Sequence, residues 1–141
     1  MRRKARILIL CKTYPSPSAA YMETSCVAGM DDAGNLIRLY PVPFRLVTED
    51  QQFSKWQWIE AIIEKSSNDH RPESHKIGVD TIQLQEVVPT SKAWGFRREM
   101  LNKLPVYDSF NALERARLDS SVTLGLIRPA RIAGLDIRKL D

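Results

Sequence analysis

The chain has 141 residues, of which 43% are hydrophobic and 27% are charged, and this composition is typical of a folded globular protein and not of a disordered chain. Its apolar runs are far shorter than the roughly 20 residues that a membrane helix needs. The basic start before Ile7–Cys11 lacks the small-residue cleavage site of a signal peptide. The sequence therefore predicts a cytoplasmic protein without membrane contact, folded as one compact domain over residues 1–141 with a short basic tail at residues 1–5.

The net charge of +4 is unevenly distributed along the chain. Residues 1–12 contain five basic side chains and no acid, whereas between residues 23 and 64 acids outnumber Lys and Arg by seven to three. The last third is basic again. This asymmetry favours a polyanion, such as DNA or RNA, as the partner of one face. Scattered surface charge and a solubilising basic tail are the alternative explanation.

The first predicted element is a strand over residues 6–11, whose continuous apolar run is typical of a strand that is covered on both faces. A proline-rich loop follows it and carries Lys12 and Tyr14, which are candidate donors to an anion. Cys11 and Cys26 both fall in apolar strand contexts, and we expect them to be reduced thiols in the core.

A β-hairpin is predicted over residues 26–45, with its turn at Asp31–Asn35. Alternation along the second strand places Arg38 and Tyr40 on one face, and the following prolines end the strand and bring Arg45 nearby. A guanidinium and a phenol therefore share one face of this strand.

Residues 54–65 form the clearest strand of the sequence. Ile59, Ala61 and Ile63 are predicted to face the core, which leaves Trp56 and Trp58 on the opposite face together with two glutamates. Either a helix covers these indoles, or they are partly open, and open indoles near Arg38 and Tyr40 would form a platform for stacked bases.

Residues 66–76 are the most polar stretch of the chain and contain both of its histidines. The candidate catalytic residues are Asp69, His70, Glu73 and His75, because His and a carboxylate can transfer protons in phosphodiester chemistry. Arg71 is the candidate phosphate ligand here. The alternatives are an ordinary exposed loop, or a structural knot in which Arg71 and Glu73 pair with Arg38 or Glu60.

The second half of the chain predicts a strand over residues 81–88 and two helices between residues 91 and 118, the second of them capped by Asp108. Two further strands are expected over residues 122–128 and 131–139, the latter burying Ile132 and either Leu135 or Ile137. Together the elements indicate an α+β fold: a curved mixed β-sheet or small β-barrel, by analogy PUA- or ASCH-like, with two helices packed on one side.

Several catalytic patterns are missing from the sequence. It has no glycine-rich phosphate loop, no CxxC pair and no nucleophile elbow, and Lys65 follows Glu64 directly, whereas a Glu-x-Lys nuclease pattern requires one residue between them. We therefore expect no cofactor and no metal.

Four segments, KTYPSPS, GNLIRLYPVPFR, FSKWQWIE and DHRPESHKI, resemble those of an uncharacterised family of bacterial proteins. The resemblance covers roughly the first half of the chain. It implies no activity and no role for any residue, and only suggests that the four segments belong together.

Three hypotheses follow. The first is a nucleic-acid-binding module for a single strand or a modified or displaced base; its contact residues would be Lys12, Tyr14, Arg38, Tyr40, Arg45, Trp56 and Arg71. The second is a small nuclease or nucleotide hydrolase that uses the 69–75 loop. The third is an accessory subunit that docks on a protein partner through the 91–104 helix, with Trp94 and Phe96 as its anchor.

Overall fold

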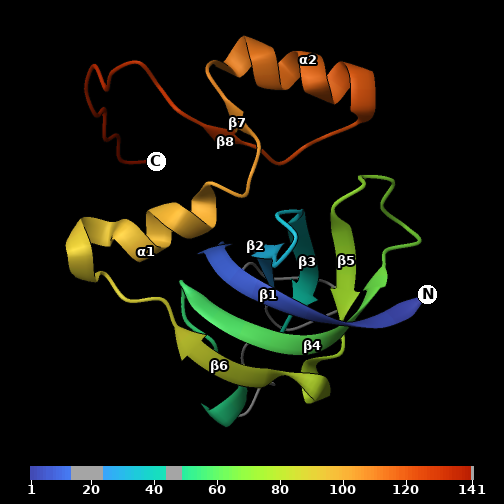
Figure 1. Cartoon of the computed structure of the whole chain (residues 1–141). Coiled ribbons are helices and arrows are strands. Elements are labelled where there is room, and N and C mark those ends of the chain that lie inside the picture. The colour runs from blue at the N-terminus through green and yellow to red at the C-terminus, as the bar shows by residue number, and fades with distance from the viewer. Residues whose placement is uncertain (14–23, 44–48, 141) are drawn as a thin grey trace.

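A computed structural model describes residues 1–13, 24–43 and 49–140 of the chain. In this part of the chain five strands close into a mixed β-barrel (Figure 1). They are β1 (Arg2–Lys12), β2 (Ser25–Asp31), β3 (Leu36–Val42), β4 (Gln57–Lys65) and β5 (Ser74–Ile77). The order around the barrel is β1-β2-β3-β5-β4 and back to β1, and β3 and β5 pair in parallel whereas the other neighbours are antiparallel. The expected α+β small barrel is therefore confirmed.

One edge of β4 pairs with β1, and the opposite edge pairs with two different strands. Its first half pairs with β6 (Gln83–Val87), and its last residues pair with β5, where Lys65 lies opposite His75. A short 3-10 helix, η3 (Val79–Thr81), connects β5 to β6, and a second one, η2 (Glu49–Gln51), precedes β4. This arrangement leaves the start of β5 and the loop before it at one end of the barrel.

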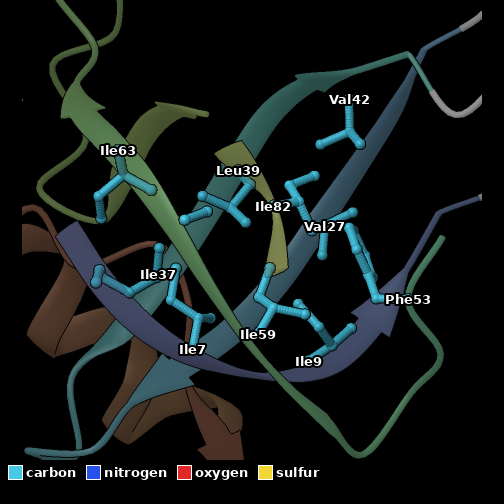
Figure 2. Close-up of a cluster of buried hydrophobic side chains, with 12 residues drawn as sticks. Ile7, Ile9, Val27, Ile37, Leu39, Val42, Phe53, Ile59, Ile63 and Ile82 are labelled. Atoms are coloured by element: carbon cyan, nitrogen blue, oxygen red, sulfur yellow. The ribbon is translucent and has the colours of Figure 1, made fainter. Parts of the chain in front are cut away.

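The barrel is filled by β-branched and aliphatic side chains that converge from its strands (Figure 2). Ile59, Ala61 and Ile63 lie in this core as predicted, each at most 1% exposed. The strands β1 and β2 approach closely at Gly29, where a Cβ atom would lie 2.5 Å from the carbonyl oxygen of Leu8. A side chain at that position would therefore force the two backbones apart.

A second apolar cluster lies outside the barrel wall, beneath the helix α1 (Ser91–Leu101). It contains Leu8, Met30, Trp58, Val88 and Leu104, and partly buried residues of α1 pack against it. Because β1 contributes to both clusters, its continuous apolar run is explained by burial on both faces, as predicted. Of the two indoles, Trp58 is covered in this cluster and is only 4% exposed, whereas Trp56 is partly buried against it.

Trp56 is also engaged by α1. Its ring meets Trp94 edge-on with the ring centroids 6.3 Å apart, and the guanidinium of Arg97 lies 4.9 Å from the centroid of Trp56 and 5.0 Å from that of Trp94. The first residues of α1, from Lys92 to Trp94, have positive φ, so the regular helix starts at Gly95.

The part of the chain after α1 crosses back over one end of the barrel (Figure 1). The strands β7 (Val106–Tyr107) and β8 (Leu126–Ile127) pair in parallel, and α2 (Phe110–Ser120) lies between them in the sequence. The helix α2 is capped by Ser109, whose hydroxyl accepts the amide N–H of Ala112 at 3.1 Å, and not by Asp108 as predicted.

Three other expectations about elements are corrected. The strand expected over residues 122–128 is limited to β8, and residues 131–139 form no strand; Ile132, Leu135 and Ile137 are more than 80% exposed. An alternating pattern is not enough for a strand where no neighbouring strand supplies hydrogen bonds. The predicted tail at residues 1–5 belongs to β1 from Arg2 onward, because Arg2–Ala5 pair with β4.

The two cysteines of the chain, Cys11 and Cys26, are free thiols. Cys11 is exposed, because an irregularity in the β1–β2 register after Ile9 interrupts the inward alternation. Cys26 is half-buried, because its neighbour Val27 takes the core-facing position on β2. Among the described residues, no helix has the length and apolar character that crossing a bilayer requires.

Candidate functional site

The loop between β4 and β5 and the end of β3 enclose a hollow of about 570 Å³, which we call the loop hollow. It brings together four of the residues that the sequence singled out: Tyr40, Asp69, Arg71 and His75. The parallel pairing of β3 with β5 places Leu39 opposite His75, and this pairing brings Tyr40 beside the loop. The remaining lining residues are Pro41, Ser66, Asn68, Ser74 and Lys76.

The loop around this hollow is held by Lys65, for which the sequence predicted no role in the site. Its ammonium Nζ donates to three backbone carbonyls, those of Asp69 at 3.0 Å, Arg71 at 2.7 Å and Ser74 at 3.1 Å. An ammonium has three N–H donors, so these three carbonyls match its full capacity. The loop therefore has a defined shape before any ligand arrives.

Asp69 and Arg71 form a bidentate ion pair on this loop. The Arg71 Nη2 is 2.6 Å from Asp69 Oδ2, and Nε also donates to both carboxylate oxygens. These hydrogen bonds hold the pKa of Asp69 well below its usual range and raise the pKa of Arg71. Asp69 is therefore a carboxylate at neutral pH, and Lys76, which is exposed, gives the lining its net positive charge.

His75 has a defined tautomer. Its Nδ1 lies 2.8 Å from the carbonyl oxygen of Glu73, and because a carbonyl can only accept, the hydrogen is on Nδ1 and Nε2 is a hydrogen-bond acceptor. Partial burial has the largest effect on the imidazole and lowers its pKa below the usual value. The hydrogen bond to Glu73 acts in the opposite direction, and the charges of Arg3 and Lys65 lower the pKa further. His75 is therefore neutral at pH 7.

Glu73 and Arg38 belong to a structural knot and not to the loop hollow. The buried carboxylate of Glu73 accepts hydrogen bonds from the backbone N–H of Thr123 at 3.0 Å and from its hydroxyl. Arg38 Nη2 donates to the same hydroxyl at 3.1 Å and lies 3.8 Å from Glu73 Oε1. The predicted pairing of Glu73 with Arg38 is thus supported, whereas Arg71 pairs with Asp69 instead. The third member of the knot, Thr123, lies 50 residues from Glu73 and gave no signal in the sequence.

A second cavity, of about 380 Å³, lies at the end of the barrel beneath the segment that follows α1, and we call it the barrel-mouth cavity. Its walls include Arg3 from β1, Leu36 and Ile37 from β3, and Tyr107 and Leu124 from the segment above. His75 lines this cavity as well as the loop hollow. His75 is therefore shared by the linings of the two spaces.

The other candidate residues lie away from these spaces or outside the described residues. The ammonium of Lys12 donates to the carbonyl of Phe53 at 3.0 Å, and burial lowers its pKa. Trp56 lies under α1, and His70 is exposed but does not line the loop hollow. Tyr14 and Arg45 fall in ranges that the structure does not describe.

The candidate catalytic groups Asp69, Glu73 and His75 of the 69–75 loop are engaged within the protein. The carboxylates of Asp69 and Glu73 are each held by hydrogen bonds from arginine or threonine, and His75 is hydrogen-bonded to a backbone carbonyl instead of a carboxylate. Within residues 1–13, 24–43 and 49–140, no three His, Cys, Asp or Glu side chains gather where they could hold a metal ion.

One family model matches the chain, over residues 3–103, and its description is "Domain of unknown function (DUF8758)". The matched range contains all five barrel strands, β6 and α1. Neither a curated protein nor a solved structure matches the chain. The likeness to PUA or ASCH barrels therefore stays a prediction.

Proposed function

Because the chain belongs to the DUF8758 family, whose function is unknown, we propose from the site alone that it binds single-stranded nucleic acid through the loop hollow. One observation carries this proposal: the exposed ring of Tyr40 shares a hollow with Arg71, Lys76 and the neutral imidazole of His75. A ring for a base beside cations for phosphates is the combination that single-strand binding proteins use.

Tyr40 supplies the stacking surface. Its side chain is 51% exposed although it lies on a barrel strand, and Pro41, in a cis peptide with Tyr40, lines the hollow beside it. A base stacked on an aromatic side chain contributes about 1–3 kcal/mol to binding. Bases in a duplex are already stacked on each other, so this surface favours a single strand.

Lys76 and Arg71 supply the phosphate contacts. Arg71 has its Nε and Nη2 on Asp69, so Lys76 carries the larger share of the net charge that a phosphate meets. Lys65 fixes the loop in place, which reduces the entropy that binding would otherwise cost. Two phosphate contacts give a slope of about −1.4 in a plot of log affinity against log salt for a single strand.

The hydrolase alternative has weaker support, because both acids of the 69–75 loop are held by other side chains. His75 Nε2 would have to act as a general base without a partnering carboxylate. The docking alternative has one observation in its favour, since Trp94 is 50% exposed and Phe96 37% exposed on α1.

The test is fluorescence anisotropy with labelled single- and double-stranded DNA and RNA at two salt concentrations, with and without magnesium. We expect salt-dependent binding to a single strand. Tyr40→Ala should weaken it roughly 5- to 150-fold, which is the equivalent of the 1–3 kcal/mol for one stacked base. Lys76→Gln should weaken it and make the salt slope shallower by about 0.7.

The matched control is Arg117→Gln on α2. Arg117 pairs with Glu114 at 2.6 Å, as Arg71 pairs with Asp69, but it lies away from the hollow. If Tyr40→Ala and Lys76→Gln bind no more weakly than Arg117→Gln, the loop hollow is not the binding site. Magnesium-dependent cleavage that His75→Gln abolishes would instead support the hydrolase.

A further inference from the structure

The barrel-mouth cavity is large enough for a small ligand and is not used by the function proposed above. At about 380 Å³ it lies within the range of small-molecule sites, roughly 300–1,000 Å³. Ile37, a residue of the barrel core, lines it, so the cavity lies directly at the end of the core. Tyr107 and Leu124, from the segment that follows α1, line it from the other side.

The walls suit a flat, largely apolar ring. Leu36, Ile37 and Leu124 supply aliphatic surface, and Pro72 and Tyr107 supply rigid ring surfaces. Rings of this kind are bound between aromatic and apolar side chains in proteins that accept a single unstacked base.

The two carboxylates of the walls, those of Asp31 and Glu73, are both engaged by hydrogen bonds within the protein, which leaves Arg3 as the lining side chain that can meet an anion. The carboxylate of Asp31 already accepts the N–H groups of Ala33 at 3.1 Å and Asn35 at 2.8 Å, together with the side-chain amide of Asn35 at 3.0 Å. Glu73 is occupied by Thr123. The acids of the cavity are therefore satisfied within the protein.

Arg3 supplies the positive charge at the rim. It continues the inward alternation of Ala5 and Ile7 along β1, but it lies beyond the buried part of the strand and is exposed. Arg3 thus lines the cavity where the buried part of β1 ends. A phosphate attached to a ring in the cavity would meet it there.

His75 relates this cavity to the loop hollow, because it is a lining residue of both. We propose that the barrel-mouth cavity receives one unstacked base of the strand that lies in the loop hollow, with the phosphate of that nucleotide beside Arg3. This inference rests on the proposed function. It assigns the cavity, with Leu124 in its lining and Arg3 at its rim, to a single nucleotide.

Two measurements test the inference. The first is a calorimetric titration with adenosine 5′-monophosphate, which has the base and the phosphate but no strand. The second uses a single-stranded oligonucleotide with one 2-aminopurine, whose fluorescence rises when the base leaves its stack. We expect the nucleotide to bind and the 2-aminopurine fluorescence to rise on binding.

Leu124→Trp should fill the cavity and lower the affinity for the nucleotide at least tenfold. It should also abolish the rise in 2-aminopurine fluorescence, while the oligonucleotide still binds in the loop hollow. Leu118→Trp is the matched control, because Leu118 is 68% exposed on α2 and lies outside the cavity. Should Leu124→Trp fail to fold, Arg3→Gln gives the same test at an exposed residue, with Arg2→Gln as its control. Arg3→Gln should lower the affinity for the nucleotide severalfold, and Arg2→Gln should leave it unchanged.

The outcomes separate this inference from the proposed function. If the oligonucleotide binds but the nucleotide does not, and the fluorescence stays flat, the base site is refuted and the proposed function stands. If the nucleotide binds and Leu124→Trp prevents it, but no oligonucleotide binds, both the strand-bound base and the proposed function are refuted. Equal behaviour of Leu124→Trp and Leu118→Trp also overturns the inference.

Discussion

Thr123→Val is the most direct test of the structural knot that attaches the segment after α2 to the barrel. The substitution keeps the shape of the side chain and removes its hydroxyl. That hydroxyl donates to the buried carboxylate of Glu73 and accepts from Arg38 Nη2 at 3.1 Å. After the change, Glu73 keeps the backbone N–H of Thr123 at 3.0 Å and the guanidinium of Arg38, 3.8 Å away.

The expected loss follows from these contacts. A hydrogen bond to a charged group contributes about 1.5–3 kcal/mol, and the variant loses two of them. The guanidinium and the carboxylate can approach each other and recover part of this energy, so we expect the free energy of unfolding to fall by about 2–3 kcal/mol. With a typical urea m-value, the midpoint of unfolding should fall by roughly 1–2 M.

Urea denaturation followed by circular dichroism measures this change, with Thr90→Val as the control. Thr90 is exposed at the start of α1 and its side chain makes no cap hydrogen bond, so the same substitution there should change stability by less than about 0.5 kcal/mol. If both variants unfold at the same urea concentration, the hydroxyl of Thr123 does not hold this segment in solution.

Two further predictions concern the barrel and its titration. Gly29→Ala should lower the free energy of unfolding by about 1–3 kcal/mol, because the new Cβ would lie 2.5 Å from the carbonyl oxygen of Leu8; Gly134→Ala, with nothing within 4 Å, should be neutral in the same thermal melts. The pKa of His75 is lower in the folded chain than its unfolded value of 6.5, so the unfolded chain binds more protons and stability falls as the pH drops below 6.5. In His75→Gln, the urea midpoint should lose the part of its pH dependence between pH 5 and pH 8 that comes from this imidazole. If the midpoint of the variant falls with falling pH as steeply as before, His75 is not the group whose lowered pKa causes the loss of stability.

The sequence was sufficient for features that depend on neighbouring residues. Alternation over residues 54–65 identified the core face of β4, and the continuous apolar run of β1 indicated burial on both sides, because each pattern reflects the geometry of one strand. The same reasoning failed at residues 131–139, where the alternation has no partner strand. The candidate site was predicted in part, since the polar stretch of residues 66–76 pointed to the loop that lines the hollow.

Only the tertiary structure decided which residues meet. Arg38 and Tyr40 share a strand face in the sequence, but the first is tied to Glu73 and Thr123 whereas the second opens on the loop hollow. The place of His75 in the linings of both spaces follows from the parallel pairing of β3 with β5 and from a segment that returns from beyond α1. Contacts between residues so far apart depend on how the barrel closes, and no local pattern of side chains encodes them.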